Sequence, residues 1–123
     1  MAQNEKDLLL KDLCARLPYK VKAQIPDEYG GYTSAIESID IDGFVVDFEG
    51  VQMEIEYITP YLFPLSSMTD EQKEEWQSLM VKDVFGLLYH TSESFDYLYK
   101  NHIDIRGLIP MGLAIDATGL NIY

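Results

Sequence analysis

An alternating trio of ionisable side chains near the C-terminal end, in the run His-Ile-Asp-Ile-Arg-Gly, is the sharpest local feature of this sequence. His102, Asp104 and Arg106 alternate there with single apolar residues. A carboxylate beside an imidazole fixes the tautomer of the ring, and a guanidinium binds oxyanions through paired N–H donors. The three side chains are therefore a candidate binding site for a small anion or a peptide terminus, and a candidate enzyme centre if they converge in one cavity.

The same three residues also have a structural interpretation. His102 would close the end of a preceding helix, Asp104 would cap the next turn, and Arg106 would pair with an acid elsewhere. This interpretation is the simpler one, because the sequence contains no glycine-rich phosphate loop, no paired-cysteine metal pattern, no His-Glu-x-x-His motif and no nucleophile elbow. The sequence thus identifies no catalytic residue, no metal ligand and no cofactor, and it leans towards a protein that is not an enzyme.

Acidic side chains dominate the charge of the chain. Asp and Glu number 21 against 9 Lys and Arg, a net charge of −12, and residues 26–58 hold nine of these acids and no Lys or Arg. The field of such a surface repels nucleic acid and anionic membranes and attracts basic partners. Asp40, Asp47, Glu54 and Glu56 form the candidate acidic interaction face. They are expected on several strands rather than in one loop, which favours a solvated face over a calcium site.

These carboxylates belong to the segment 34–57, which predicts three strands joined by two-residue turns at Asp42-Gly43 and Glu49-Gly50. Successive side chains of a strand point to opposite faces, so the turns predict the register. The apolar face is predicted to hold Ile39, Ile41, Phe44, Val46, Phe48, Val51, Met53, Ile55 and Tyr57. The opposite face is predicted to hold Ser38, Asp40, Val45, Asp47, Gln52, Glu54 and Glu56. Residues 19–25 alternate as well and predict a fourth strand beside 34–41.

Helices are predicted on either side of this sheet. Residues 4–17 show an apolar stripe that includes Cys14, expected as a small buried side chain. Thr69 begins a capping box that starts a helix to about residue 83, and Thr91 or Ser92 caps another to about residue 101. Residues 59–65 read as an extended connection leaving the sheet, 84–90 as either strand or helix, and 113–117 as a last strand. The prediction is a single α+β domain, 1–123, with a four-stranded antiparallel meander covered on one face by about three helices.

Cysteine usage and hydropathy bear on the compartment. A single cysteine excludes an internal disulfide, and no apolar run approaches the ~20 residues that cross a bilayer. No signal peptide is visible, since the short leucine run at 8–10 follows two acidic residues. These features predict a cytoplasmic protein that does not bind membranes.

Three segments resemble a family of short uncharacterised proteins from Bacteroides-type gut bacteria, often met in phage-like or mobile regions. They are Leu13–Tyr19, the stretch Pro-Tyr-Leu-x-Pro-Leu-Ser-Ser-Met-Thr at 60–69, and His-x-Asp-x-Arg-Gly-Leu-Ile-x-x-Gly-Leu-Ala at 102–114. The resemblance spans most of the chain in order and departs from the family at Phe63 and Pro110. It implies a mobile-element context and carries no assigned activity.

Three functional hypotheses follow. The first is a non-enzymatic module that binds another protein, one rich in basic residues, and it rests on the missing catalytic patterns, the acidic surface and the nine tyrosines. The second is an acidic nucleic-acid mimic that inhibits a DNA-binding or restriction enzyme, without contacting nucleic acid itself. It requires a continuous acidic band, which Lys20 and Lys22 would interrupt. The third is an enzyme or small-anion site that uses His102, Asp104 and Arg106.

Overall fold

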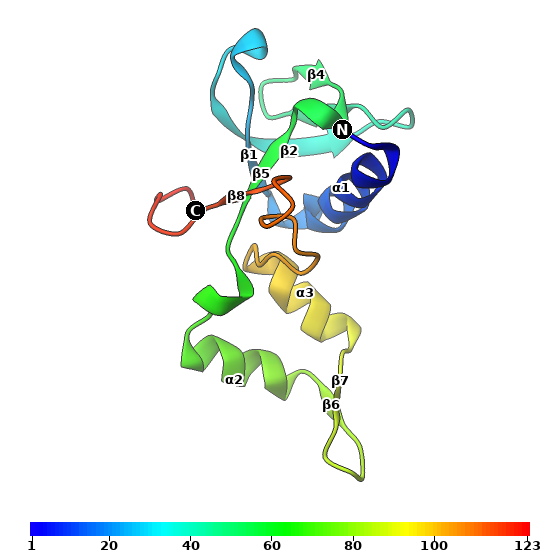
Figure 1. Cartoon of the computed structure of the whole chain (residues 1–123), viewed down its shortest axis with the longest axis vertical. Coiled ribbons are helices and arrows are strands. Elements are labelled where there is room, and N and C mark those ends of the chain that lie inside the picture. Colours follow the sequence, from blue (N-terminus) through cyan, green and yellow to red (C-terminus); the bar gives the residue numbers. More distant parts are fainter.

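The computed structural model describes residues 1–123 and has a mixed α+β fold in which the main sheet has six strands, not four (Figure 1). The strand order is β4-β3-β2-β1-β5-β8, and every neighbouring pair is antiparallel except the parallel pair β5–β8. The strands are β1 Lys22–Gln24, β2 Thr33–Ile39, β3 Val45–Asp47, β4 Gln52–Met53, β5 Thr59–Leu62 and β8 Ile115–Asp116. Short 3₁₀ turns lie at Leu17–Tyr19, Asp27–Tyr29, Ile55–Tyr57 and Leu65–Ser67. The predicted pairing of the 19–25 strand with the 34–41 strand is confirmed by β1 and β2.

The prediction that residues 59–65 leave the sheet is wrong for their first half. Thr59–Leu62 forms β5, with Pro60 opposite Ala23 of β1 and Tyr61 opposite Ile115 of β8. Prolines are rare inside sheets because they lack an N–H donor, which is why the sequence argued against a strand here. The segment leaves the sheet only after Leu62, and it then runs towards α2 (Figure 1).

The predicted register of the meander is wrong, because both turns have three-residue loops rather than two-residue loops. Asp40 N–H donates to Phe44 O at 2.9 Å, and Gly43 N–H donates to Asp40 O at 3.0 Å. The Asp40 carboxylate also accepts from the backbone N–H groups of Asp42 and Phe44, and Gly43 takes a positive φ of 85°. The extra loop residue places Ile39 opposite Val45 instead of Val46.

The loop from Asp47 to Val51 has the same geometry, so the one-residue change affects both faces of the meander. Val45 is fully buried and Asp47 is 1% exposed, although both were predicted on the acidic face. Ile41 is 100% exposed and Phe48 is 68% exposed, although both were predicted on the apolar face. In β3 the one-residue change exchanges the two faces, whereas Ile41 and Phe48 are exposed because they lie in the three-residue loops.

The first helix, α1, runs from Gln3 to Arg16 and packs beside the sheet (Figure 1). Leu9 and Leu13 are fully buried in the main core, as the apolar stripe predicts. Cys14 is exposed, so the prediction that it is buried is wrong. Asp12 and Arg16 occupy the buried face instead, and both are inaccessible to solvent.

The other two helices form a separate unit below the sheet, here called the helical arm (residues 65–103; Figure 1). It contains α2 (Asp70–Ser78), α3 (Ser92–Lys100) and a two-stranded hairpin of β6 (Val81–Lys82) and β7 (Leu88–Tyr89). Its core consists of Met68, Leu98 and Ile103, whereas the main core of 14 buried residues includes none from α2 or α3. The prediction that three helices cover the sheet is therefore wrong, since only α1 contributes to the main core.

The predicted starts of these helices are confirmed. Thr69 Oγ1 accepts from Gln72 N–H at 3.1 Å and the Gln72 side chain accepts from Thr69 N–H at 2.9 Å, while Thr91 caps α3. However, α2 ends at Ser78 rather than near residue 83, because the following residues enter the hairpin. Residues 84–90 are the turn and second strand of that hairpin. No helix in the structure has the length and apolar character needed to cross a bilayer.

Candidate functional sites

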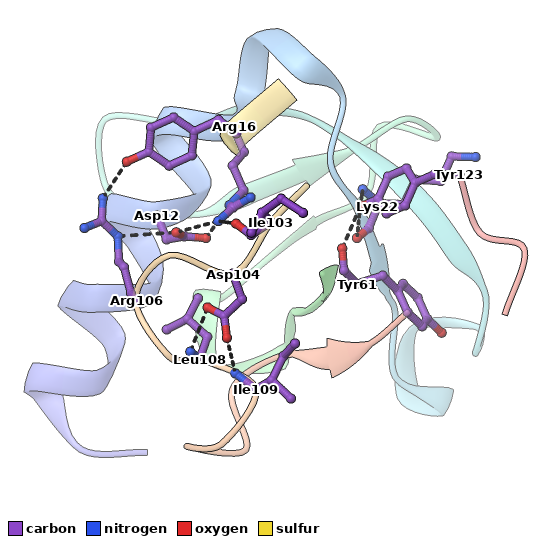
Figure 2. A network of polar contacts seen from close by, with 11 residues as sticks. Asp12, Arg16, Lys22, Tyr61, Ile103, Asp104, Arg106, Leu108, Ile109 and Tyr123 are labelled. Atoms are coloured by element: carbon purple, nitrogen blue, oxygen red, sulfur yellow. Dashed lines mark hydrogen bonds and ion pairs between the residues drawn. The ribbon is translucent and has the colours of Figure 1, made fainter. Parts of the chain in front are cut away.

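The three side chains of the His-x-Asp-x-Arg run do not converge in one cavity. Asp104 is buried, and its carboxylate oxygens each accept one backbone N–H, from Leu108 at 2.9 Å and from Ile109 at 2.9 Å (Figure 2). Asp104 thus holds the turn that follows it, as predicted, but through residues four and five positions further along and without a helix to cap. His102 lines a different concavity, and Arg106 points towards α1.

Arg106 pairs with an acid elsewhere, as predicted, and the acid is the buried Asp12 of α1. Figure 2 shows that Arg106 and Arg16 approach the Asp12 carboxylate from opposite sides. Arg16 Nε lies 2.7 Å from Asp12 Oδ2, and Arg106 Nε lies 3.3 Å from Asp12 Oδ1. Arg16 Nη2 also donates to Ile103 O at 2.6 Å, while Arg106 Nη2 donates to the Tyr99 hydroxyl at 3.0 Å. The cluster therefore fastens α1 to the helical arm.

His102 lies just beyond Asn101, the C-cap residue of α3, so its predicted position at a helix end is correct to within one residue. It takes a positive φ of 60°, and its ring stacks on the Tyr123 ring with centroids 3.6 Å apart. Nδ1 of the imidazole is buried without a hydrogen-bond partner. Burial, together with the positive charges of Arg16 and Lys22, lowers the pKa of His102 to about 4. The ring is therefore uncharged at neutral pH.

This shift predicts a loss of stability in mild acid. The pKa of His102 is about 4 in the folded protein against 6.5 for the free group, so the unfolded chain takes up a proton first as the pH falls. The contribution of His102 to the free energy of unfolding is therefore complete above pH 6.5 and is lost as the pH falls towards 4. Allowing for the partly exposed ring, we expect the free energy of unfolding to fall by about 1–2 kcal/mol between pH 7 and pH 5 through this residue. Urea titrations at both pH values measure the fall. His102→Asn places a residue there that tolerates positive φ but does not titrate. If that variant lost as much stability between pH 7 and pH 5 as the wild type, His102 would not be the cause.

The four residues of the candidate acidic face do not form one solvated surface. Asp40 and Asp47 are used in the meander turns, and Asp47 also accepts the Tyr32 hydroxyl, a contact that raises the pKa of Tyr32 to about 12. Of the other two, Glu54 is exposed and Glu56 forms an ion pair with Lys6 at 3.2 Å. Two of the four carboxylates thus have local structural roles.

The most exposed apolar surface belongs to the hairpin of residues 81–89, here called the β6–β7 hairpin, which the sequence did not single out. Its two strands pair only with each other, and its tip projects away from the rest of the molecule (Figure 1). Val84 and Phe85 at the tip are 93% and 86% exposed. The exposed large apolar residues of the hairpin are Val81, Val84, Phe85, Leu87, Leu88 and Tyr89. The other four are 45–58% exposed.

The turn and base of the hairpin are held in place although its apolar side chains are not. At the turn, the Asp83 carboxylate accepts from Phe85 and Leu87 N–H at 2.8 and 2.9 Å, and from the Tyr89 hydroxyl at 3.0 Å. At the base, Thr91 Oγ1 donates to Leu79 O at 2.6 Å. The His90 ring lies 5.6 Å from the Trp76 ring and 4.6 Å from the Phe95 ring. The hairpin is therefore a pre-shaped element rather than a loose loop.

No group of three His, Cys, Asp or Glu side chains is placed to hold a metal ion. Comparison of the chain with protein-family models, curated protein sequences and solved structures finds no match. The resemblance to the gut-bacterial proteins stays a prediction.

Proposed function

We propose that this protein is a non-enzymatic module that binds another protein through the β6–β7 hairpin. The observation that carries the proposal is the exposure of six large apolar side chains within nine residues of a projecting element. Monomeric soluble proteins rarely expose contiguous apolar patches of this kind, and such patches mark interaction sites. An isolated two-stranded hairpin is marginally stable in water, so covering this one by a partner would stabilise it.

The charges around the hairpin describe the partner. Residues 69–101 contain seven Asp and Glu against three Lys: four of the acids lie on α2, two on α3, and Asp83 lies in the hairpin turn. An apolar tip flanked by carboxylates complements a protein groove that is apolar inside and basic at its rim. The same carboxylates oppose insertion into an anionic membrane. The partner is therefore expected to be a basic protein, in agreement with the overall charge of −12.

A photo-crosslinking amino acid placed at position 85 tests the proposal, and position 41 provides a matched control. Ile41 lies at the tip of a turn with the same backbone pattern and is fully exposed, but it belongs to the sheet. We expect a discrete crosslinked protein from position 85 in native lysate and none from position 41. Once that protein is purified, Phe85→Ser should weaken its binding by at least about tenfold, because exposed aromatic anchors dominate interface energies. Ile41→Ser should change binding by less than about twofold.

Other outcomes would contradict the proposal. A partner that binds Phe85→Ser and wild type equally would show that the hairpin is not the binding element. Sedimentation of the wild-type protein with vesicles would indicate a membrane-binding tip. Crosslinking only between copies of the chain, with a concentration-dependent sedimentation coefficient, would indicate self-association instead.

The geometry supports neither a nucleic-acid mimic nor an enzyme that uses His102, Asp104 and Arg106 together. A nucleic-acid mimic requires a continuous row of carboxylates, whereas Asp40 and Asp47 are committed to turns and Glu56 is paired with Lys6. An enzyme built on His102, Asp104 and Arg106 requires them to meet, and they point to three different surroundings.

A further inference from the structure

A concavity of about 440 Å³ beside His102 differs in charge from the other hollows of the molecule. It is the only one of four whose wall contains no Asp or Glu. In a chain with 21 acidic residues, such a wall is unexpected. The wall brings together the end of α3, the start of α2 and the C-terminal segment, from which Lys100, His102, Gln72, Phe63, Thr118 and Tyr123 contribute.

Positive charges lie on and behind the wall of this concavity, and that of Arg16 is paired with the Asp12 carboxylate. Lys100 lies on its wall and forms no ion pair. Behind the wall, the charges of Arg16 and Lys22 both act on His102 to lower its pKa, and the Arg16 charge also acts on Tyr123. Lys22 Nζ lies 5.9 Å from the centre of the Tyr123 ring. An anion placed here would therefore meet the Lys100 ammonium group, and no Asp or Glu lies among the wall residues.

Ser67 and Asn101 of the wall already donate to backbone carbonyls, to Pro64 O at 2.7 Å and to Tyr97 O at 2.8 Å, so the donors that remain are those of Gln72 and Lys100. Gln72 uses its Oε1 to accept the Thr69 N–H, which leaves its NH₂ group as the donor that it offers. Lys100 supplies an ammonium group. Phe63 and the buried Ile103 supply apolar surface beside them. Donors next to an apolar wall are the features that fix a small amphiphilic ligand.

We infer that this concavity is a binding site for a small organic carboxylate. The carboxylate group lies near Lys100 and the Gln72 amide, and the apolar body of the ligand lies against Phe63 and Ile103. The site is separate from the β6–β7 hairpin and does not depend on the function proposed for it.

Benzoate, benzamide and inorganic phosphate are suitable probes, because benzamide lacks the charge and phosphate lacks the apolar body. Titrations of the full-length protein are followed by the NMR signals of His102 and Tyr123. We expect benzoate to give saturable shifts at these two residues and to bind more tightly than either of the other probes. Lys100→Gln should weaken benzoate binding by about tenfold, the effect of one charge-assisted hydrogen bond. Lys73→Gln removes another exposed helix lysine, one outside the concavity, and should change the affinity for benzoate by less than about twofold.

Three results would overturn the inference. Shifts that do not saturate with benzoate would show that there is no site. Equal affinities for benzoate and benzamide, or equal effects of Lys100→Gln and Lys73→Gln, would show that the charge is not recognised. Phosphate binding as tight as benzoate binding would remove the role of the apolar wall. Both lysine variants change exposed residues, so their folding is checked by the unchanged NMR spectrum of the sheet.

Discussion

Asp12→Ala is expected to lower the free energy of unfolding by about 3–5 kcal/mol, because it leaves a buried guanidinium without its carboxylate. Arg16 is inaccessible to solvent, and its Nη1 already lacks a hydrogen-bond partner. After the change, Arg16 keeps only its hydrogen bond to Ile103 O, and Arg106 loses its nearest acid. Urea titration monitored by the Trp76 fluorescence and by far-UV circular dichroism measures the loss.

Two variants separate the cost of an unpaired charge from other effects. Asp7→Ala removes an exposed carboxylate from the same helix and should change stability by less than about 0.5 kcal/mol. In the double variant Asp12→Leu/Arg16→Met no buried charge remains at these two positions, and it should recover most of the stability lost in Asp12→Ala. A double variant as unstable as Asp12→Ala would show that the ionic contacts themselves are essential.

Asp104→Ala is expected to lower the free energy of unfolding by about 3 kcal/mol. The change leaves the backbone N–H groups of Leu108 and Ile109 without their acceptor, and each buried donor that loses a charged partner costs about 1–3 kcal/mol. Asp104→Asn retains one acceptor oxygen, so about half of this loss is expected. Urea titration at neutral pH measures both variants.

Asp116 provides the matched control for Asp104. Both residues begin an Asp-x-x-Gly-Leu sequence, but Asp116 is exposed and accepts only the Thr118 N–H. Asp116→Ala should therefore cost less than about 1 kcal/mol. Equal losses at the two positions would mean that the turn sequence matters and the burial of the carboxylate does not.

The local signals in the sequence predicted helix starts well and turn geometry poorly. The Thr69 capping box is correct because its hydrogen bonds join residues three apart. The predicted register is wrong because Asp42-Gly43 and Glu49-Gly50 are the last two residues of three-residue loops, not complete two-residue loops. The useful pattern is longer: Asp-x-x-Gly followed by an apolar residue. It occurs at Asp40, Asp47, Asp83, Asp104 and Asp116, always with a positive φ at the glycine and a backbone N–H bound by the Asp carboxylate.

Contacts between distant residues could not be predicted from local patterns. Asp12 and Arg16 have the spacing of an ordinary exposed helix pair, and only the chain near Ile103 and Arg106 turns this pair into a buried cluster. The parallel pairing of β5 with β8 joins segments more than fifty residues apart. The hairpin was missed for a related reason, since the run from Val84 to Tyr89 is equally apolar in a buried strand and in an exposed one.

The unequal size of the two cores implies two levels of stability in one chain. The main core joins 14 buried residues and that of the helical arm joins three, so opening the arm exposes far less apolar surface than unfolding the sheet. The arm is therefore expected to open before the sheet unfolds, with the Asp12 cluster and the backbone bridge between Phe63 and Ile103 as its attachments. A partner that binds the β6–β7 hairpin binds only the folded helical arm. Its binding free energy therefore raises the stability of the arm, the less stable of the two units.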